Sequence, residues 1–181
     1  MRLTALIAAP IAAVVLGSAL TAFAAPAMAQ TPPAAASSPS KGVRVAETRT
    51  WLTGLGGAVG EPETADNASI LRVADQPLPW LVAFYACTDL CDDLQYSATF
   101  SGPITEAQVN AWNRDNRYVT AAWYPPAAAG GEATVVARYD LLLTALGTAQ
   151  LQEPTFVWLQ QLRAFAQYLA AQGAPAATSG Q

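Results

Sequence analysis

The two cysteines, Cys87 and Cys91, are the residues of this chain best suited to covalent chemistry. They follow a continuous apolar run of strand length, residues 80–86, and enclose only Thr88-Asp89-Leu90. This spacing predicts a tight hairpin whose mouth brings the two Cα atoms within disulfide range. Three interpretations are open: a structural disulfide, two free thiols, or a redox-active or metal-binding pair. An oxidising compartment would favour the disulfide.

Other residue types that carry catalysis or bind metals are scarce. Asp89, Asp92 and Asp93 surround Cys91, but the stretch lacks the glycine and final glutamate of a calcium loop. A solvated turn is therefore the preferred interpretation over a cation site. The chain has no histidine, which removes Ser-His and Cys-His nucleophiles and most zinc or copper sites. We expect no metal, no cofactor and no enzymatic activity.

Three asparagines, Asn110, Asn113 and Asn116, recur at every third residue beside Arg114 and Arg117. Amide side chains both donate and accept hydrogen bonds, so they suit tying a helix to a neighbouring loop or strand end. The alternative is contact with a ligand or peptide, in which the two arginines would bind an anion. These five residues are the candidate partner-binding residues.

The elements that must position these residues are a strand and a helix. Polar and apolar residues alternate over residues 93–100, which predicts a strand with one buried face. Pro103 ends that strand, and Thr105 with Gln108 has the spacing of a capping box at a helix start. Trp112 falls on the apolar face of this helix, so we expect it to be buried between the helix and the sheet.

The rest of the chain supplies the other layers. We expect a first helix at residues 47–55, further strands at 69–74, 118–124 and 134–143, and a closing helix whose first residue is Pro154. An apolar stripe on the closing helix consists of Trp158, Leu162, Phe165 and Leu169. The order is α-β-β-β-α-β-β-α. It predicts an α+β fold with an antiparallel sheet of about five strands and helices packed against it.

The N-terminus has the pattern of a secretory signal peptide, residues 1–29. Arg2 precedes an apolar core, residues 6–20, and Ala27-Met28-Ala29 forms a small-residue cleavage site. An uncleaved helix that anchors the chain is the alternative. We expect a Pro/Ala/Ser-rich disordered linker at 30–43, one domain at 44–172 and a disordered tail at 173–181. The cleaved protein would be periplasmic or secreted, with no further membrane contact.

Charge narrows the range of partners. Of nine Lys and Arg, only Arg2 lies in the leader, so the cleaved chain keeps eight against thirteen Asp and Glu, a net charge of −5. No basic run remains. Nucleic acid is therefore not an expected partner, and anionic lipid is not attracted.

Several blocks resemble the YbjN-domain family of bacterial sensory-transduction regulators. The most specific is the asparagine–tryptophan block VNAWNRDNRY, preceded by LVAFYAC and CDDLQYSATF; ARYDLLLT and FVWLQQLRAFAQYL complete the resemblance. It spans about residues 48–169. It implies a fold like that of type III secretion chaperones, an α+β module that often dimerises and offers an apolar surface to partners. It implies no catalytic residue.

The sequence thus favours an exported, non-enzymatic module of binding, chaperone-like or regulatory function, with a protein or peptide partner or a second copy of itself. The alternative is a periplasmic thiol-redox protein that uses Cys87 and Cys91. Redox pairs usually lie at a helix start, where the dipole lowers the thiol pKa, whereas this pair borders strands and acidic residues. An enzyme whose site the sequence does not disclose is the third alternative.

Overall fold

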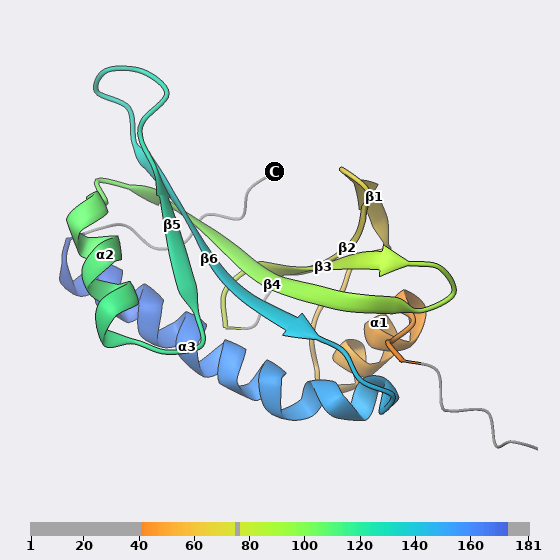
Figure 1. Ribbon diagram of the computed structural model, residues 1–181. Coiled ribbons are helices and arrows are strands. Elements are labelled where there is room, and N and C mark those ends of the chain that lie inside the picture. Colours follow the sequence, from red (N-terminus) through yellow and green to blue (C-terminus); the bar gives the residue numbers. More distant parts are fainter. Residues whose placement is uncertain (1–40, 75–76, 174–181) are drawn as a thin grey trace, which may run out of the picture. The chain divides into compact units, whose positions relative to one another are not determined.

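The computed structural model describes residues 41–74 and 77–173 (Figure 1). The expected leader and most of the expected linker and tail lie outside the described residues. The helices are α1 (Val45–Gly54), α2 (Glu106–Asp115) and α3 (Gln152–Ala171), and a 3-10 helix, η1 (Gly147–Leu151), leads into α3. The strands are β1 (Glu63–Ala65), β2 (Ala68–Val73), β3 (Trp80–Cys87), β4 (Cys91–Gly102), β5 (Thr120–Tyr124) and β6 (Ala133–Leu142). In this part of the chain, no helix combines the length and hydropathy needed to cross a bilayer.

The predicted α+β class is confirmed, with one correction to the sheet. The described residues form six antiparallel strands, not five, in the order β1-β2-β3-β4-β6-β5. The additional strand is β1, which has three exposed residues and therefore no alternating pattern. A two-residue turn, Asp66-Asn67, joins it to β2, and both residues have positive φ as this hairpin turn requires.

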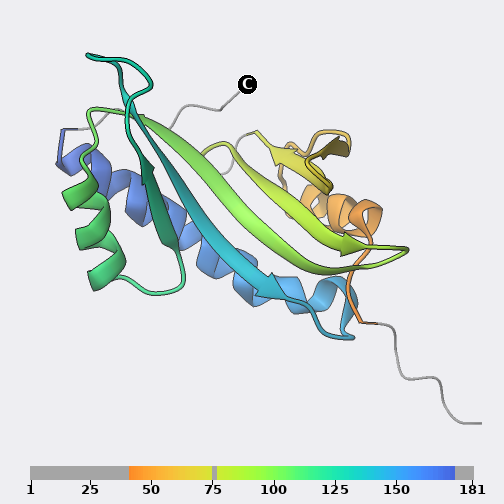
Figure 2. The ribbon, with the colours of Figure 1, turned by 45° about the horizontal axis from the view of Figure 1, so that its top comes forward.

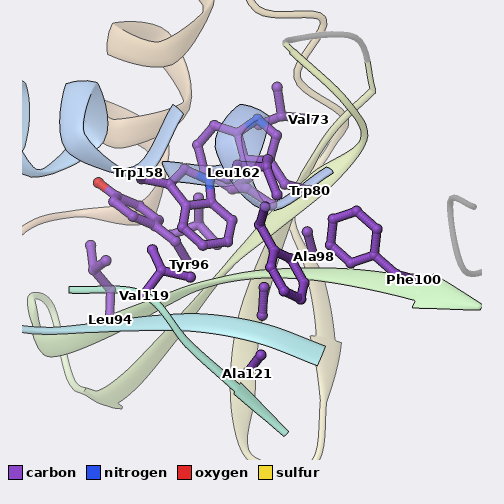
Figure 3. Close-up of a cluster of buried hydrophobic side chains, with 14 of the residues drawn as sticks. Val73, Trp80, Leu94, Tyr96, Ala98, Phe100, Val119, Ala121, Trp158 and Leu162 are labelled. Atoms are coloured by element: carbon purple, nitrogen blue, oxygen red, sulfur yellow. The ribbon is translucent and has the colours of Figure 1, made fainter. Parts of the chain in front are cut away.

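The core lies between one face of the sheet and the helices (Figure 2). The predicted stripe of α3 is confirmed, since Trp158, Leu162, Phe165 and Leu169 are all fully buried. Trp158 packs among the aromatic rings of the sheet, with ring centroids 6.0 Å from Trp80 and 5.9 Å from Tyr96 (Figure 3). These large side chains fix α3 along the length of β4 and its neighbours.

The strand and helix that carry the candidate residues form as their patterns predict. Phe100 and the other apolar residues of β4 are buried on the face toward α3. At the start of α2, Thr105 Oγ1 accepts from the Gln108 amide and Gln108 Oε1 accepts from the Thr105 amide, which confirms the capping box. Some boundaries were wrong. α3 begins at Gln152, so Pro154 is its third residue, where a proline still removes no helical hydrogen bond. β5 begins at Thr120 and not at residue 118, because Tyr118 has a positive φ and forms a turn.

Candidate functional site

Asn113 covers the outer edge of β5. Its Nδ2 donates to the Ala121 carbonyl and its Oδ1 accepts from the Ala121 amide, each at 2.8 Å. β5 is a terminal strand of the described sheet, so the Ala121 groups point away from β6 and would otherwise lack a strand partner. The carboxamide therefore takes the place of a neighbouring strand.

Two further side chains of the asparagine block bind the backbone nearby. Trp112 is buried, packs on the rings of Phe165 and Tyr168, and donates through Nε1 to the Val119 carbonyl at 3.3 Å. Asn116 Nδ2 donates to the Trp112 carbonyl at 3.0 Å, one of the last carbonyls of α2. The predicted burial of Trp112 is confirmed, although the rings it contacts belong to α3.

The remaining candidate partner-binding residues face solvent. Arg114 pairs with the adjacent Asp115, with 2.9 Å between Nε and Oδ1, and both side chains are well exposed. The Arg117 guanidinium lies 5.7 Å from the centre of the Tyr118 ring. Asn110 is exposed, and no hydrogen bond is described for its side chain. The structure thus separates Asn113 and Asn116, which hold α2 in place, from three residues that are accessible to a partner.

A disulfide joins Cys87 to Cys91 across the mouth of the β3–β4 hairpin. Cys87 is exposed, whereas Cys91 is buried against Val43. Val43 and Cys91 exchange two backbone hydrogen bonds, of 3.2 and 2.9 Å. The bond therefore fastens the hairpin tip at the place where the chain enters the fold.

The three aspartates near Cys91 do not converge. Asp89 Oδ2 pairs with Arg44 at 2.6 Å, and this hydrogen bond and charge lower the pKa of the exposed Asp89 carboxyl. Asp92 lies 3.8 Å from Lys41 Nζ, and Asp93 is opposite Tyr85 in the β3–β4 register. Among the described residues, no group of three or more His, Cys, Asp or Glu side chains is placed to hold a metal ion. No helix begins at either cysteine, so the arrangement lacks the dipole that activates a redox thiol.

An apolar groove of about 850 Å³ lies where the end of α1 faces η1 and the start of α3. Its lining residues are Leu55, Ala149, Gln150, Gln152, Glu153, Pro154, Thr155, Phe156 and Leu159. Leu55 is 55% exposed and Phe156 is 61% exposed, although both are large apolar side chains. The sequence pattern gave no sign of this groove, because Leu55 ends one helix and Phe156 lies off the buried stripe of α3.

The floor of the groove is fixed by a buried hydroxyl pair. Thr155, one of the lining residues, lies 2.7 Å from the Tyr96 hydroxyl on β4. Burial raises the pKa of Tyr96 well above its usual value, so the phenol stays protonated and can donate to Thr155. The groove is thus largely apolar, and Glu153 is the one charged residue of its lining.

Comparisons with known proteins bear on the fold. No family model and no curated protein sequence matches the chain. The crystal structure of YbjN, a proposed transcription regulator from E. coli, is similar with a TM-score of 0.50 and 17% sequence identity. The match covers 72% of this chain and 93% of YbjN. At this identity the likeness shows a YbjN-like fold, in agreement with the resemblance in the sequence.

Proposed function

We propose that this chain is an exported, non-enzymatic module of the YbjN type that binds an apolar segment of a protein partner in the groove between α1 and α3, and so chaperones or regulates that partner. The observation that carries the proposal is the exposure of Leu55 and Phe156 on a preformed groove. Complete burial of such a side chain contributes roughly 1.5–3 kcal/mol. Leu55 and Phe156 are therefore the expected anchors for an apolar segment of a partner.

The fold supports the same class of function. YbjN is itself a proposed regulator, and its architecture accounts for most of the described residues. Apart from Glu153 and the hydroxyl of Thr155, which is bonded to Tyr96, the residues that line the groove are apolar or carry amides. This lining suits recognition of a surface better than turnover of a small substrate.

Site-specific photo-crosslinking tests this proposal in cells that produce the full chain. Phe156 is replaced by p-benzoylphenylalanine, and a matched control carries the same residue at Ala107, on the exposed side of α2. We expect one recurrent adduct from position 156, none from position 107, and loss of the adduct when Leu55→Asp is added. Leu55 is 55% exposed, so Leu55→Asp should leave the melting temperature almost unchanged. Equal adducts from both positions, or none from either, would rule out the groove as the binding site.

Export is a separate part of the proposal, supported by the apolar core and the small-residue site that precedes Gln30. The intact mass of the protein recovered from the periplasm should correspond to a chain that begins at Gln30. Recovery of the uncleaved chain in the membrane fraction would instead indicate an anchored protein.

A further inference from the structure

The last residues of β6, 139–142, have a strand on one side only. β6 pairs with β4 as far as Asp93↔Leu142, but it pairs with β5 only as far as Thr120↔Arg138. Figure 1 shows β6 continuing past the start of β5. This end of β6 is therefore an edge of the sheet.

The backbone groups on this edge can be assigned from the hydrogen-bond pattern. The Leu143 amide donates to the Asp92 carbonyl, so the odd-numbered residues of this part of β6 face β4. The β5 side gives the same alternation. The backbone of Ala121 bonds to Asn113 and not to its partner Ala137, so the even-numbered residues of β6 are the ones that bond to β5. The amides and carbonyls of Asp140 and Leu142 consequently point away from β4. In the described part of the chain, no hydrogen bond to these outward backbone groups is present.

A strained turn keeps this edge free. Tyr118 has a φ of 71°, and the Val119 amide donates to the Arg117 carbonyl across it, a three-residue turn that is rare for a bulky residue. The turn directs the chain away from β6 immediately before β5 begins. It also leaves the Tyr118 ring 57% exposed and 6.3 Å from the ring of Tyr139.

We propose that this edge, residues 139–142, receives an extended segment of a partner protein as an additional strand. Main-chain groups of Asp140 and Leu142 would pair with the backbone of the segment, and alternate side chains would give selectivity. Leu142 is 84% exposed and calls for an apolar residue opposite it. The Tyr118 and Tyr139 rings flank the other face of the same edge.

The carboxylate of Asp140 favours a basic residue opposite it in the partner segment. Asp140 Oδ1 accepts from Gln95 Nε2 at 2.6 Å, but no cation is described within ion-pair distance of its carboxylate. Burial is the largest cause of the raised pKa of Tyr139, followed by Tyr118 and then by Glu153, so a second carboxylate lies near this edge. A lysine or arginine opposite Asp140 would neutralise this charge. A second copy of the chain fits less well, because two-fold pairing would place the two Asp140 carboxylates diagonally across the new ladder.

The test is a titration of the isotope-labelled mature chain, followed by the backbone amides in NMR spectra. The probe is the peptide Thr-Leu-Val-Lys-Val-Thr, which sets Leu and Lys on one face, and its control has Glu in place of Lys. We expect the amides of Asp140 and Leu142 to shift with the lysine peptide, which should bind several-fold more tightly than the control. The Ala121 amide, already bonded to Asn113, should not move. Shifts with neither peptide at millimolar concentration would overturn the proposal.

Two variants separate strand addition from other contacts. Leu142→Pro removes the outward amide and no bond to β4, so it should abolish binding while the melting temperature changes little. Asp140→Lys should reverse the preference toward the glutamate peptide, and it tests the edge even if the proline variant does not fold. Unchanged binding by both variants would overturn the proposal. So would a dimer of the wild-type chain that the proline variant abolishes, since it would assign the edge to a second copy.

Discussion

The outer edge of β5 and the end of β6 differ in whether their outward backbone groups have a hydrogen-bond partner. On β5, a side chain of α2 supplies the donor and acceptor that a neighbouring strand would have supplied, at 2.8 Å each. On β6, the outward groups of Asp140 and Leu142 have no such cover among the described residues. The contrast lies within one hairpin, because the two strands are consecutive in the chain and paired to each other.

The difference shows what closing an edge requires. An unpaired strand edge is a template for association, and native sheets commonly cover it or make it short and charged. Asn113 can reach Ala121 because α2 leads directly into β5, with Trp112 buried beside it. Among the described residues, no element that follows Tyr118 is placed to do the same for β6. The proposed binding at the end of β6 rests on this contrast between a covered edge and an exposed one.

A change at Trp112 should disturb the covered edge of β5 most, because this residue holds α2 in place. We expect Trp112→Ala to destabilise the protein by about 3–5 kcal/mol, because it empties a buried site between α2 and α3 and removes the bond to the Val119 carbonyl. Urea unfolding at 25 °C measures the loss. Trp112→Phe keeps an aromatic ring at the site but loses the hydrogen bond to the Val119 carbonyl, so it should cost only about 1 kcal/mol. A loss for Trp112→Ala below ~1 kcal/mol would mean that α2 does not depend on this side chain.

Much of the structure around the covered edge of β5 could be predicted from local sequence. Alternation over residues 93–100 and the Thr105–Gln108 spacing are short-range patterns, and both fold as expected. A structural role was expected of the asparagines, since amides suit it; Asn113 and Asn116 have that role, whereas Asn110 is exposed. The partner of Asn113 was not, because it depends on where the strained turn at Tyr118 places the start of β5.

Features that leave no periodic pattern in one stretch of sequence were not predictable. β1 is too short and too exposed to leave a periodic pattern. The groove needs Leu55 and Phe156 to face each other across 101 positions of sequence, which the pattern within α1 or within α3 does not encode. The open end of β6 is invisible in sequence for the same reason: residues 134–143 have the pattern of one strand, and only the length of β5 decides where its cover stops.

The Cys87–Cys91 disulfide is a covalent link with which the hydrogen-bonded cover of β5 by Asn113 can be compared. The Cys87–Cys91 bridge closes a very short loop, so it should stabilise the fold by roughly 2 kcal/mol in the chain-entropy account. Reduction should therefore lower the melting temperature by several degrees without unfolding the domain. Cys87→Ser, which changes the exposed partner only, should match the reduced protein. Two reactive thiols in protein taken fresh from the periplasm would contradict the bridge and revive the redox interpretation.

Asn113 tests the closed edge itself. Asn113→Ala leaves the Ala121 amide and carbonyl without their partner, and we expect a loss of about 1–2 kcal/mol, with water replacing part of the two bonds. Hydrogen exchange at the Ala121 amide should accelerate. Asn110→Ala is the matched control on the same helix, because that side chain is exposed and should change stability by less than ~0.5 kcal/mol. Equal losses for the two variants would show that the carboxamide does not act as a substitute strand.

The smallest effect is expected at the open edge. Leu142→Ser should change the free energy of unfolding by less than ~0.5 kcal/mol, because the side chain is 84% exposed and its backbone amide points away from β4. In the unmodified protein the amides of Asp140 and Leu142 should exchange quickly, while that of Leu143, bonded to the Asp92 carbonyl, is protected. Hydrogen exchange read residue by residue makes this comparison within one sample. If Leu142→Ser cost as much as Asn113→Ala, or if the Leu142 amide were as protected as that of Ala121, the end of β6 would be covered as β5 is, and the contrast between the two edges would fail.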